Sequence, residues 1–306
     1  MNQVGSRADS IPRLLRRHGL RPDKRLGQNF LVEPAALDRV VRAAELQADE
    51  TVLEIGAGLG TLTVRLAAAA RRVIAIEVDR RLIPILAEEM EGCPNVEIIQ
   101  GDALQIDLEA VTRGEAYAVV ANIPYMITSA LIRRLMEAAH PPGRLVLTLQ
   151  AEVGERIVAG PGEMSLLALS VQVYGAPRLA ARIPSGAFYP APEVESVVLR
   201  IDRHPLARIP AERIPAFFRM ARAGFSQKRK TLRNAAAGGL VVKPAVVAEW
   251  MRTAGLPATA RAQELSLGDW DRLVGAATAD GWQAGGWKSV NGGAKGEVEN
   301  ALSATG

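Results

Sequence analysis

The chain has few of the side chains that build disulfide frameworks and metal sites. Its single cysteine, Cys93, excludes an intramolecular disulfide. Its three histidines, His18, His140 and His204, are scattered and show no metal-ligand spacing. We therefore expect no metal, so other groups must carry any chemistry.

Long apolar segments are also missing. The longest stretch without a formal charge, residues 116–132, contains Asn122 and Pro124 and is not a convincing membrane span. The first ten residues lack the apolar core of a secretory signal, so we expect a cytoplasmic protein with no membrane partner. With 48% hydrophobic and 23% charged residues, the composition is typical of a globular chain, and the length of 306 residues favours two domains.

Charge is unevenly spread along the chain. Residues 1–30 carry a net charge of +5, residues 31–202 carry −8, and residues 203–281 carry +7, while residues 282–306 are neutral. Two basic regions that flank an acidic centre favour a polyanionic partner. A solvated charged surface explains the same counts equally well, so the charge alone does not show whether the chain binds a polyanion.

Short β-rich runs alternate with helix-compatible stretches from Thr51 onward. The runs are residues 51–55, 72–77, 96–100, 116–121 and 144–150, with further ones at 167–175 and 196–201. Apolar strands that alternate with helices predict an α/β domain with a parallel sheet covered on both faces. We assign residues 31–202 to this domain.

The rest of the chain has different patterns. Residues 1–30 form a basic amino-terminal arm. Residues 203–281 have apolar side chains at helical spacing, with Pro244 in a first helical turn, and predict a small all-α domain. Residues 282–306 are rich in glycine and are expected to be disordered, with docking of Trp282 or Trp287 as the less favoured alternative.

Glycines follow the first β-rich run, at Gly56, Gly58 and Gly60. At a strand-to-helix turn, glycines let a ligand approach the backbone at the carboxyl edge of the sheet. The spacing G-x-G-x-G, with Thr61 in the sixth position, departs from the dinucleotide fingerprint and argues against nicotinamide or flavin. We therefore expect another kind of nucleotide ligand.

Acidic residues stand at the ends of the next two runs: Glu77 is the last residue of the first, and Asp102 follows the second. Glu77 can accept hydrogen bonds from both ribose hydroxyls, and Asp102 can accept one from an adenine amine. Both would repel a phosphate, so the pattern favours an adenosine without phosphate, and S-adenosylmethionine fits that description. A helix cap or an exposed loop end is the alternative for each acid, but it becomes improbable when three successive strand ends carry such features.

The fourth run leads into Asn122-Ile123-Pro124-Tyr125. The exocyclic amine of adenine is a poor nucleophile because its lone pair is delocalised into the ring. The oxygen of Asn122 and a backbone carbonyl at the Ile123–Pro124 step can accept its two N–H groups and direct the lone pair at a methyl group. Tyr125 offers a ring for stacking. Phe188 is a candidate for the opposite face of the base, with core packing as its alternative.

Taken together, these residues resemble the ribosomal RNA adenine dimethylases of the KsgA (RsmA) type. The resemblance covers about residues 13–275 and rests on motifs at residues 26–31, 54–60, 77, 101–103, 122–125, 188–196, 225–234 and 261–266. It implies a Rossmann-like, S-adenosylmethionine-dependent methyltransferase domain followed by a small helical domain. It also implies dimethylation of two adjacent adenosines in the 3′-terminal hairpin loop of 16S rRNA, within a small ribosomal subunit or its precursor. We expect a monomer.

The resemblance assigns roles by motif. The residues that it implies for the cofactor are Asn29, Leu31, Gly56, Gly58, Glu77, Asp102, Ala103 and Asn122. Those that it implies for the transfer are Asn122, Pro124, Tyr125 and Phe188, with the last two around the target base. Two departures concern local RNA contacts: Ala151 stands where the family usually has lysine, and residues 163–167 lack the usual Tyr-Gly pair.

A basic segment follows in the helical region. Residues 226–234 predict a helix capped by Ser226, which places Lys230 and Arg233 at i, i+3 spacing. With Lys228 and Arg229, these side chains suit RNA phosphates. An ordinary charged helix face is the alternative, and it is less favoured beside the methyltransferase motifs.

Two other functions fit parts of the pattern. The related family that methylates 23S rRNA and confers macrolide resistance shares the glycine loop and the Asn-x-Pro-Tyr element, but the motif at residues 228–234 favours the small-subunit family. A non-catalytic RNA-binding assembly factor is the other alternative. It has no need of Asn122, Pro124 and Tyr125, because a binder does not polarise an amine.

Overall fold

The structure is a computed structural model that describes residues 11–283 and 286–287. The chain divides into two compact units, residues 1–208 and 209–306. The sequence pattern placed this change at residues 202–203, but strand β9 (Ser196–Arg203) continues to Arg203. Within the described residues, no helix is long and apolar enough to cross a membrane.

A seven-stranded sheet of order β4-β3-β2-β5-β6-β9-β7 forms the centre of the first unit. The strands in parallel register are β2 (Thr51–Ile55), β3 (Arg72–Glu77), β4 (Val96–Gln100), β5 (Tyr117–Asn122) and β6 (Arg144–Gln150). Strand β9 pairs antiparallel with β6 and with β7 (Gly175–Ile183). The expected runs at 51–150 and 196–201 are confirmed as strands, with β5 shifted by one residue, and so is the α/β fold class.

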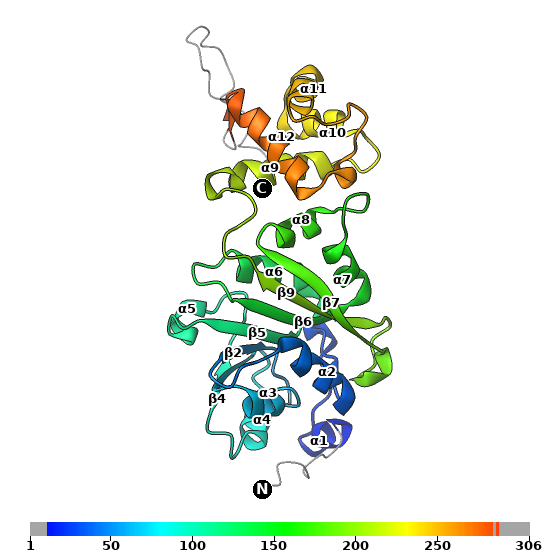
Figure 1. The fold of residues 1–306 in the computed structure, drawn as a ribbon. Helices are drawn as coiled ribbons and strands as arrows, with labels where there is room; N and C mark the ends of the chain where they lie inside the picture. Colours follow the sequence, from blue (N-terminus) through cyan, green and yellow to red (C-terminus); the bar gives the residue numbers. More distant parts are fainter. Residues whose placement is uncertain (1–10, 284–285, 288–306) are drawn as a thin grey trace, which may run out of the picture. The chain divides into compact units, whose positions relative to one another are not determined.

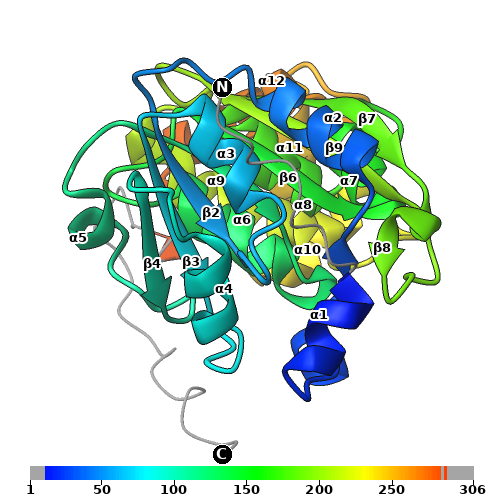
Figure 2. The same ribbon diagram turned by 90° about the horizontal axis from the view of Figure 1, so that it is seen from below.

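Helices cover both faces of this sheet, as Figures 1 and 2 show. Helices α2 (Pro34–Ala44), α3 (Thr63–Ala69) and α4 (Ile83–Glu89) lie on one face, and α6 (Thr128–Met136), α7 (Ala151–Val158) and α8 (Leu166–Gln172) lie on the other. Helix α5 (Leu108–Thr112) precedes β5. On the first face, Leu37 and Val40 of α2 join Val52, Val120 and Val146 of the strands in one buried cluster. Since both faces are covered, β2 is buried along its whole length.

The expectation of a strand at residues 167–175 is wrong. Most of this run forms α8, whose first turn is capped by the Ser165 hydroxyl accepting from the Ala168 amide at 3.1 Å. A short apolar run does not distinguish a buried strand from a buried helix. The strand lies further on, in β7, where Pro177 is tolerated because β7 is an edge strand.

The amino-terminal segment packs against the carboxyl end of the sheet. Helix α1 (Ile11–Arg17) buries Ile11, Leu14 and Leu15 against Phe30, Leu59, Leu82 and Ile85. A short 3₁₀ helix, η1 (Lys24–Leu26), then leads to β1 (Phe30–Leu31), which pairs antiparallel with β8 (Phe188–Tyr189). Residues 11–31 are thus fixed to the unit that carries the sheet.

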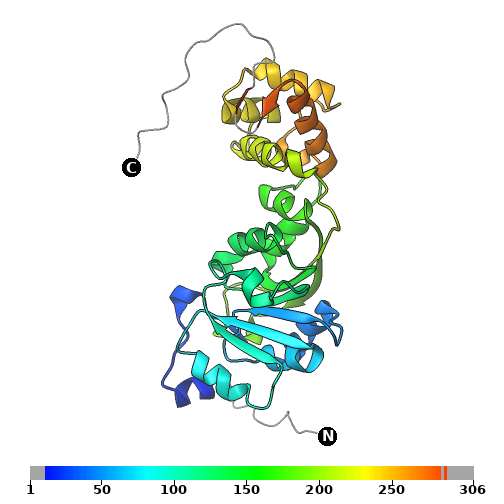
Figure 3. The same cartoon turned by 90° about the vertical axis from the view of Figure 1, so that its left-hand side faces the viewer.

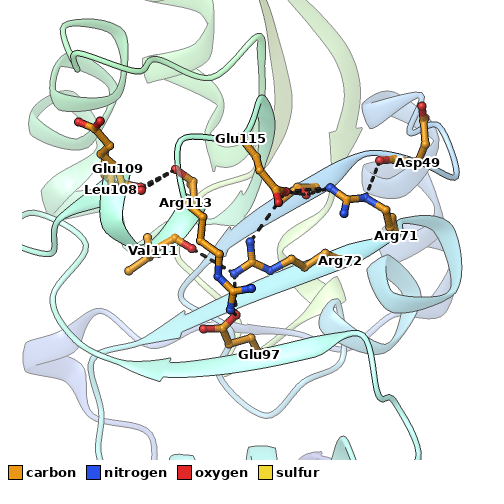
Figure 4. Close-up of polar contacts among 11 residues, drawn as sticks. Asp49, Arg71, Arg72, Glu97, Leu108, Glu109, Val111, Arg113 and Glu115 are labelled. Carbon is orange, nitrogen blue, oxygen red and sulfur yellow. Dashed lines mark hydrogen bonds and ion pairs between the residues drawn. The ribbon is translucent and has the colours of Figure 1, made fainter.

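At the amino ends of the strands, charged side chains form a network (Figure 4). Arg71 pairs with Glu115 at 2.8 Å, and Arg72, the first residue of β3, pairs with Glu97 at 2.6 Å. Glu97 also accepts from Arg113 at 3.1 Å. These charges lie at the amino ends of β3, β4 and β5, so the two glutamates at this end of the sheet are held in ion pairs.

The second unit is helical (Figure 3, yellow to orange). It consists of α9 (Ile214–Phe225), α10 (Leu232–Leu240), α11 (Pro244–Thr253) and α12 (Leu267–Ala279), with short 3₁₀ turns before α9 and α12. Pro244 is in the first turn of α11, as its position in the sequence predicts. Trp270 of α12 is fully buried, and its ring stacks on Phe225 at 5.7 Å.

The expectation of disorder is wrong for the first residue of the glycine-rich end. Trp282 is 1% exposed, and its ring centre lies 5.9 Å from that of Trp250 and 5.7 Å from the Arg219 guanidinium. It lies in β10 (Trp282–Gln283), which pairs with β11 (Gly286–Trp287). Residues 284–285 and 288–306 lie outside the described residues.

Candidate active site

The glycine loop leaves the carboxyl end of β2 and turns back against β3. The amides of Gly56 and Ala57 donate to the carbonyl of Ile76 at 2.9 and 3.1 Å. Gly58 adopts a φ of +59°, and a Cβ there would lie 3.1 Å from the ring of Phe30. Only glycine fits this conformation and this space without strain. The loop therefore presents bare backbone beneath Phe30.

Glu77 lies beside this loop at the end of β3 and is 5% exposed. Its two carboxylate oxygens accept from the amides of Gly58 and Asp79, both at 2.8 Å. Burial raises its pKa, and these amide hydrogen bonds oppose that shift. Because each carboxylate oxygen has a second lone pair, Glu77 can still accept from two hydroxyls of a ligand.

Asn122 ends β5 on the same edge of the sheet. Its Nδ2 donates to the backbone carbonyl of Asn29 at 2.8 Å. This bond engages the amide nitrogen and leaves the side-chain oxygen as the acceptor for a substrate. The next amide, that of Ile123, donates to the backbone carbonyl of Thr148 in the neighbouring β6 at 3.2 Å. This bond holds the chain extended before Pro124.

A cavity joins these elements. The side chains and backbone around it are Leu26, Gly27, Gln28, Asn29, Phe30, Gly56, Gly58, Glu77, Val78, Leu82, Asn122, Ile123 and Pro124. Six of the residues predicted from the sequence line it: Asn29, Gly56, Gly58, Glu77, Asn122 and Pro124. It lies at the carboxyl edge of parallel strands, where α/β folds bind their ligands.

Four predicted residues lie close to this edge without lining the cavity. Leu31 is 2% exposed, and its carbonyl accepts from the Thr61 hydroxyl at 3.0 Å. Asp102 accepts from the amide of Leu104 at 2.8 Å, which makes it a turn cap, and Ala103 is buried beside it. Phe188 is 4% exposed and packs in the core cluster with Leu31. Their contacts with cofactor or base stay predictions.

The side chain of Tyr125 lies outside the part that the structure describes. Its backbone begins the 3₁₀ turn η2 (Tyr125–Ile127), directly after Pro124. The predicted stacking by this ring therefore remains a prediction.

Sequence reasoning missed a link that holds the covering segment in place. Gln28 donates to Asp79 at 2.9 Å and accepts from the amide of Asp23 at 2.7 Å. Arg81 pairs with Asp79 at 2.7 Å and with Asp23 at 3.6 Å. The Arg81 hydrogen bond lowers the pKa of Asp79 to about 2. Gln28 stands inside the motif at residues 26–31, but its partner 51 residues away carries no sequence signal.

The basic residues of the second unit lie differently from the prediction. Ser226 does not begin a helix: it ends α9, and its hydroxyl donates to the Ala223 carbonyl at 2.7 Å. The next helix, α10, begins at Leu232 after Thr231. Lys228, Arg229 and Lys230 are therefore exposed residues of the α9–α10 loop, and Arg233 lies in the first turn of α10. The helix was expected too early because Ser226 is a favourable cap residue.

The chemistry of the cavity fits S-adenosylmethionine. Glu77 offers acceptors for two ribose hydroxyls, the loop at Gly56 and Gly58 offers bare backbone, and Phe30 offers an apolar cover. No phosphate-binding cation lines the cavity, in keeping with a nucleoside that carries no phosphate. Over the described residues, no group of three or more His, Cys, Asp or Glu side chains is placed to hold a metal ion.

Comparison with known proteins agrees with this chemistry. The family model "Ribosomal RNA adenine dimethylase" matches residues 19–276. A Dehalococcoides mccartyi protein named Ribosomal RNA small subunit methyltransferase A is 42% identical over 255 residues, 83% of this chain and 88% of that protein. A protein of the same name from Pelotomaculum thermopropionicum is 39% identical over 277 residues, 86% of this chain and 94% of its own length.

Solved structures show the same relationship. A dimethyladenosine transferase from Plasmodium falciparum is 26% identical with a TM-score of 0.68, over 82% of this chain and 98% of that one. The 23S rRNA methyltransferase ErmE is 26% identical with a TM-score of 0.67, over 81% of this chain and 99% of that one. The chain therefore belongs to the ribosomal RNA adenine dimethylase family, and it is an S-adenosylmethionine-dependent adenine dimethyltransferase.

Proposed function

We propose that this enzyme places two methyl groups on N6 of each of two adjacent adenosines in the 3′-terminal hairpin loop of 16S rRNA. It works as a monomer in the cytoplasm, on small ribosomal subunits or their precursors. Relatives that carry the small-subunit name, at 39% and 42% identity over most of the chain, support this target.

The orientation of Asn122 carries the proposal. Because Nδ2 donates to the Asn29 carbonyl at 2.8 Å, the side-chain oxygen is the group that accepts an N–H of the target amine. The backbone carbonyl at the Ile123–Pro124 step accepts the other N–H. The two acceptors direct the nitrogen lone pair at the methyl group, and positioning of this kind supplies up to about 7–11 kcal/mol of a barrier.

Bound S-adenosylmethionine supplies an electrophilic methyl group on its sulfonium. Glu77 accepts from the ribose hydroxyls, and Asp102 contacts the adenine of the cofactor. Phe30 and the segment at Gly27–Asn29 exclude water from this side. No general base is required, because the methylated amine loses its proton to solvent.

Lys228, Arg229, Lys230 and Arg233 bind phosphates of the RNA in this proposal. The first three are exposed in the α9–α10 loop, and Arg233 is half-buried, with its Nε donating to the Asn234 side chain at 3.3 Å. Four cations within six residues give a local positive potential that attracts a polyanion.

The test is to map the product. The protein is incubated with methyl-labelled S-adenosylmethionine and with purified small and large ribosomal subunits that lack adenine methylation. Label should enter small-subunit RNA, and mass spectrometry should find dimethyladenosine at two adjacent positions of the 3′-terminal hairpin. Label in large-subunit RNA alone would show that the enzyme has the other target.

A further inference from the structure

A wide groove lies beside the transfer cavity in the first unit. It has a volume of about 1050 Å³ and is bordered by α1 with the turn that follows it and by the loop at residues 189–194. Gly27, Gln28 and Asn29 line both the groove and the transfer cavity. The groove and the transfer cavity are therefore neighbours.

The groove has the volume of a large ligand pocket but not its enclosure. Pockets for small ligands occupy about 300–1000 Å³ and bury most of the ligand. At about 1050 Å³ this groove lies at the upper end of that range, and it is open along its side, so its shape also admits a segment of a polymer.

Three cations line the groove and are available to a ligand. Arg16, Arg21 and Lys24 are exposed, and no side chain of the described residues forms an ion pair with them. By contrast, the neighbouring Arg25 pairs with Asp23 at 3.2 Å. Glu193 is the acidic side chain among the lining residues, so the groove keeps a net positive charge.

An aromatic side chain completes the lining. Tyr189 is 36% exposed, and its backbone pairs with Phe30 in the β1–β8 ladder, which fixes the residue beside the cavity. Phe188, its neighbour, is buried in the core. A fixed, partly exposed ring next to unpaired cations is the combination that binds single-stranded nucleic acid, by stacking a base and attracting the backbone.

We propose that this groove holds the RNA nucleotides that flank the target adenosine. Arg16, Arg21 and Lys24 contact their phosphates, and Tyr189 stacks on a neighbouring base. The inference rests on the proposed function and adds a second RNA contact, in the first unit, to the loop at Lys228–Lys230. It also gives the basic amino-terminal segment a role in guiding the strand, beyond covering the cofactor.

The test compares two triple variants of the full-length protein. The first, Arg16→Gln/Arg21→Gln/Lys24→Gln, removes the groove cations. The matched control, Arg42→Gln/Arg156→Gln/Arg208→Gln, removes three exposed arginines of the same unit that do not line the groove. The probe is a synthetic RNA hairpin with the sequence of the 16S 3′ end, and its affinity is measured from 50 to 300 mM salt.

Loss of a phosphate contact lowers the salt slope of the logarithm of affinity by about 0.7 for single-stranded nucleic acid. The salt slope of the groove variant should therefore be smaller than that of the wild type by about 2. Its KM for small subunits should be higher, and its affinity for S-adenosylmethionine should be unchanged. The control should keep the wild-type slope. Tyr189→Leu should raise KM for the RNA without changing the salt slope, since stacking involves no charge.

Two results would overturn the inference. Equal slopes in the groove and control variants would show that the RNA does not follow the groove. A groove variant that binds the hairpin normally but fails on whole subunits would show that the groove contacts a ribosomal protein. A wild-type protein that methylates no small-subunit RNA would instead reject the proposed function, so the two failures are distinguishable.

Discussion

The glutamates at the two ends of the parallel strands are held in different ways. At the amino ends, Arg71, Arg72 and Arg113 pair with Glu97 and Glu115 (Figure 4). At the carboxyl ends, Glu77 is buried and is held by backbone amides, and no cation of the described residues forms an ion pair with it. Glu97 and Glu115 are held by arginines, whereas Glu77 keeps acceptor capacity for a ligand, although the nearby Asp79 pairs with Arg81.

The glycines of positive φ also differ between the two ends. Gly56, Gly58 and Gly60 all have positive φ values at the carboxyl end, where the loop folds back under Phe30. The amino end also has a glycine of positive φ, Gly114, but nothing lies within 4 Å of the position of its Cβ. Gly58 is therefore both left-handed and crowded, whereas Gly114 is left-handed alone.

The largest change in cofactor affinity should come from exchanging one glutamate at each end. Glu77→Gln should weaken the binding of S-adenosylmethionine about 10- to 100-fold, because hydrogen bonds to a charged group contribute about 1.5–3 kcal/mol. Glu97→Gln breaks two ion pairs at the amino end and should leave this affinity unchanged. Isothermal titration calorimetry of the two variants measures both. Similar losses in both would remove the distinction between the ends.

Gly58 and Gly114 provide a second comparison of the two ends, with a smaller expected effect on cofactor affinity. Gly58→Ala and Gly114→Ala both force a Cβ into a left-handed conformation, which costs about 1–2 kcal/mol of folding free energy. Only the first also pushes against the Phe30 ring at 3.1 Å. We expect Gly58→Ala to lower cofactor affinity about tenfold, or about 1.4 kcal/mol, and Gly114→Ala to leave it unchanged. Thermal unfolding measures the stability that each variant loses.

The sequence could predict the strands and the residues at their ends, but it could not predict contacts that depend on the fold. Strands such as residues 51–55 and 72–77 are apolar runs bounded by turn residues, so their ends could be located, and with them Glu77. Asn122 could be located in the same way, after the run at residues 116–121. The Gln28–Asp79 bond joins residues 51 positions apart and depends on the fold. The helix at Leu166–Gln172 was expected as a strand because a short apolar run is compatible with either structure. The α9–α10 loop was expected as a helix because Ser226 is a favourable cap residue.

Glu54 has an effect on stability that depends on pH. It is 1% exposed in β2, and burial raises its pKa from the usual 4.5 to about 8. Its proton is lost at lower pH in the unfolded chain than in the folded one. The stability that it contributes is therefore complete below about pH 4.5 and is lost as the pH rises to about 8.

The variant Glu54→Gln has no proton to lose at this position. Its unfolding free energy should therefore fall less between pH 5 and pH 8 than that of the wild type. Urea unfolding at several pH values within that window measures the difference. Parallel pH curves for the two proteins would show that the carboxyl has no raised pKa.

The central claim is that the oxygen of Asn122 holds the target amine, and single-turnover methylation by Asn122→Ala tests it most directly. Loss of one positioned polar group should lower the transfer rate about 10²- to 10³-fold. The affinities for small-subunit RNA and for S-adenosylmethionine, measured on the same preparation, should change far less. A transfer rate equal to that of the wild type would contradict the account.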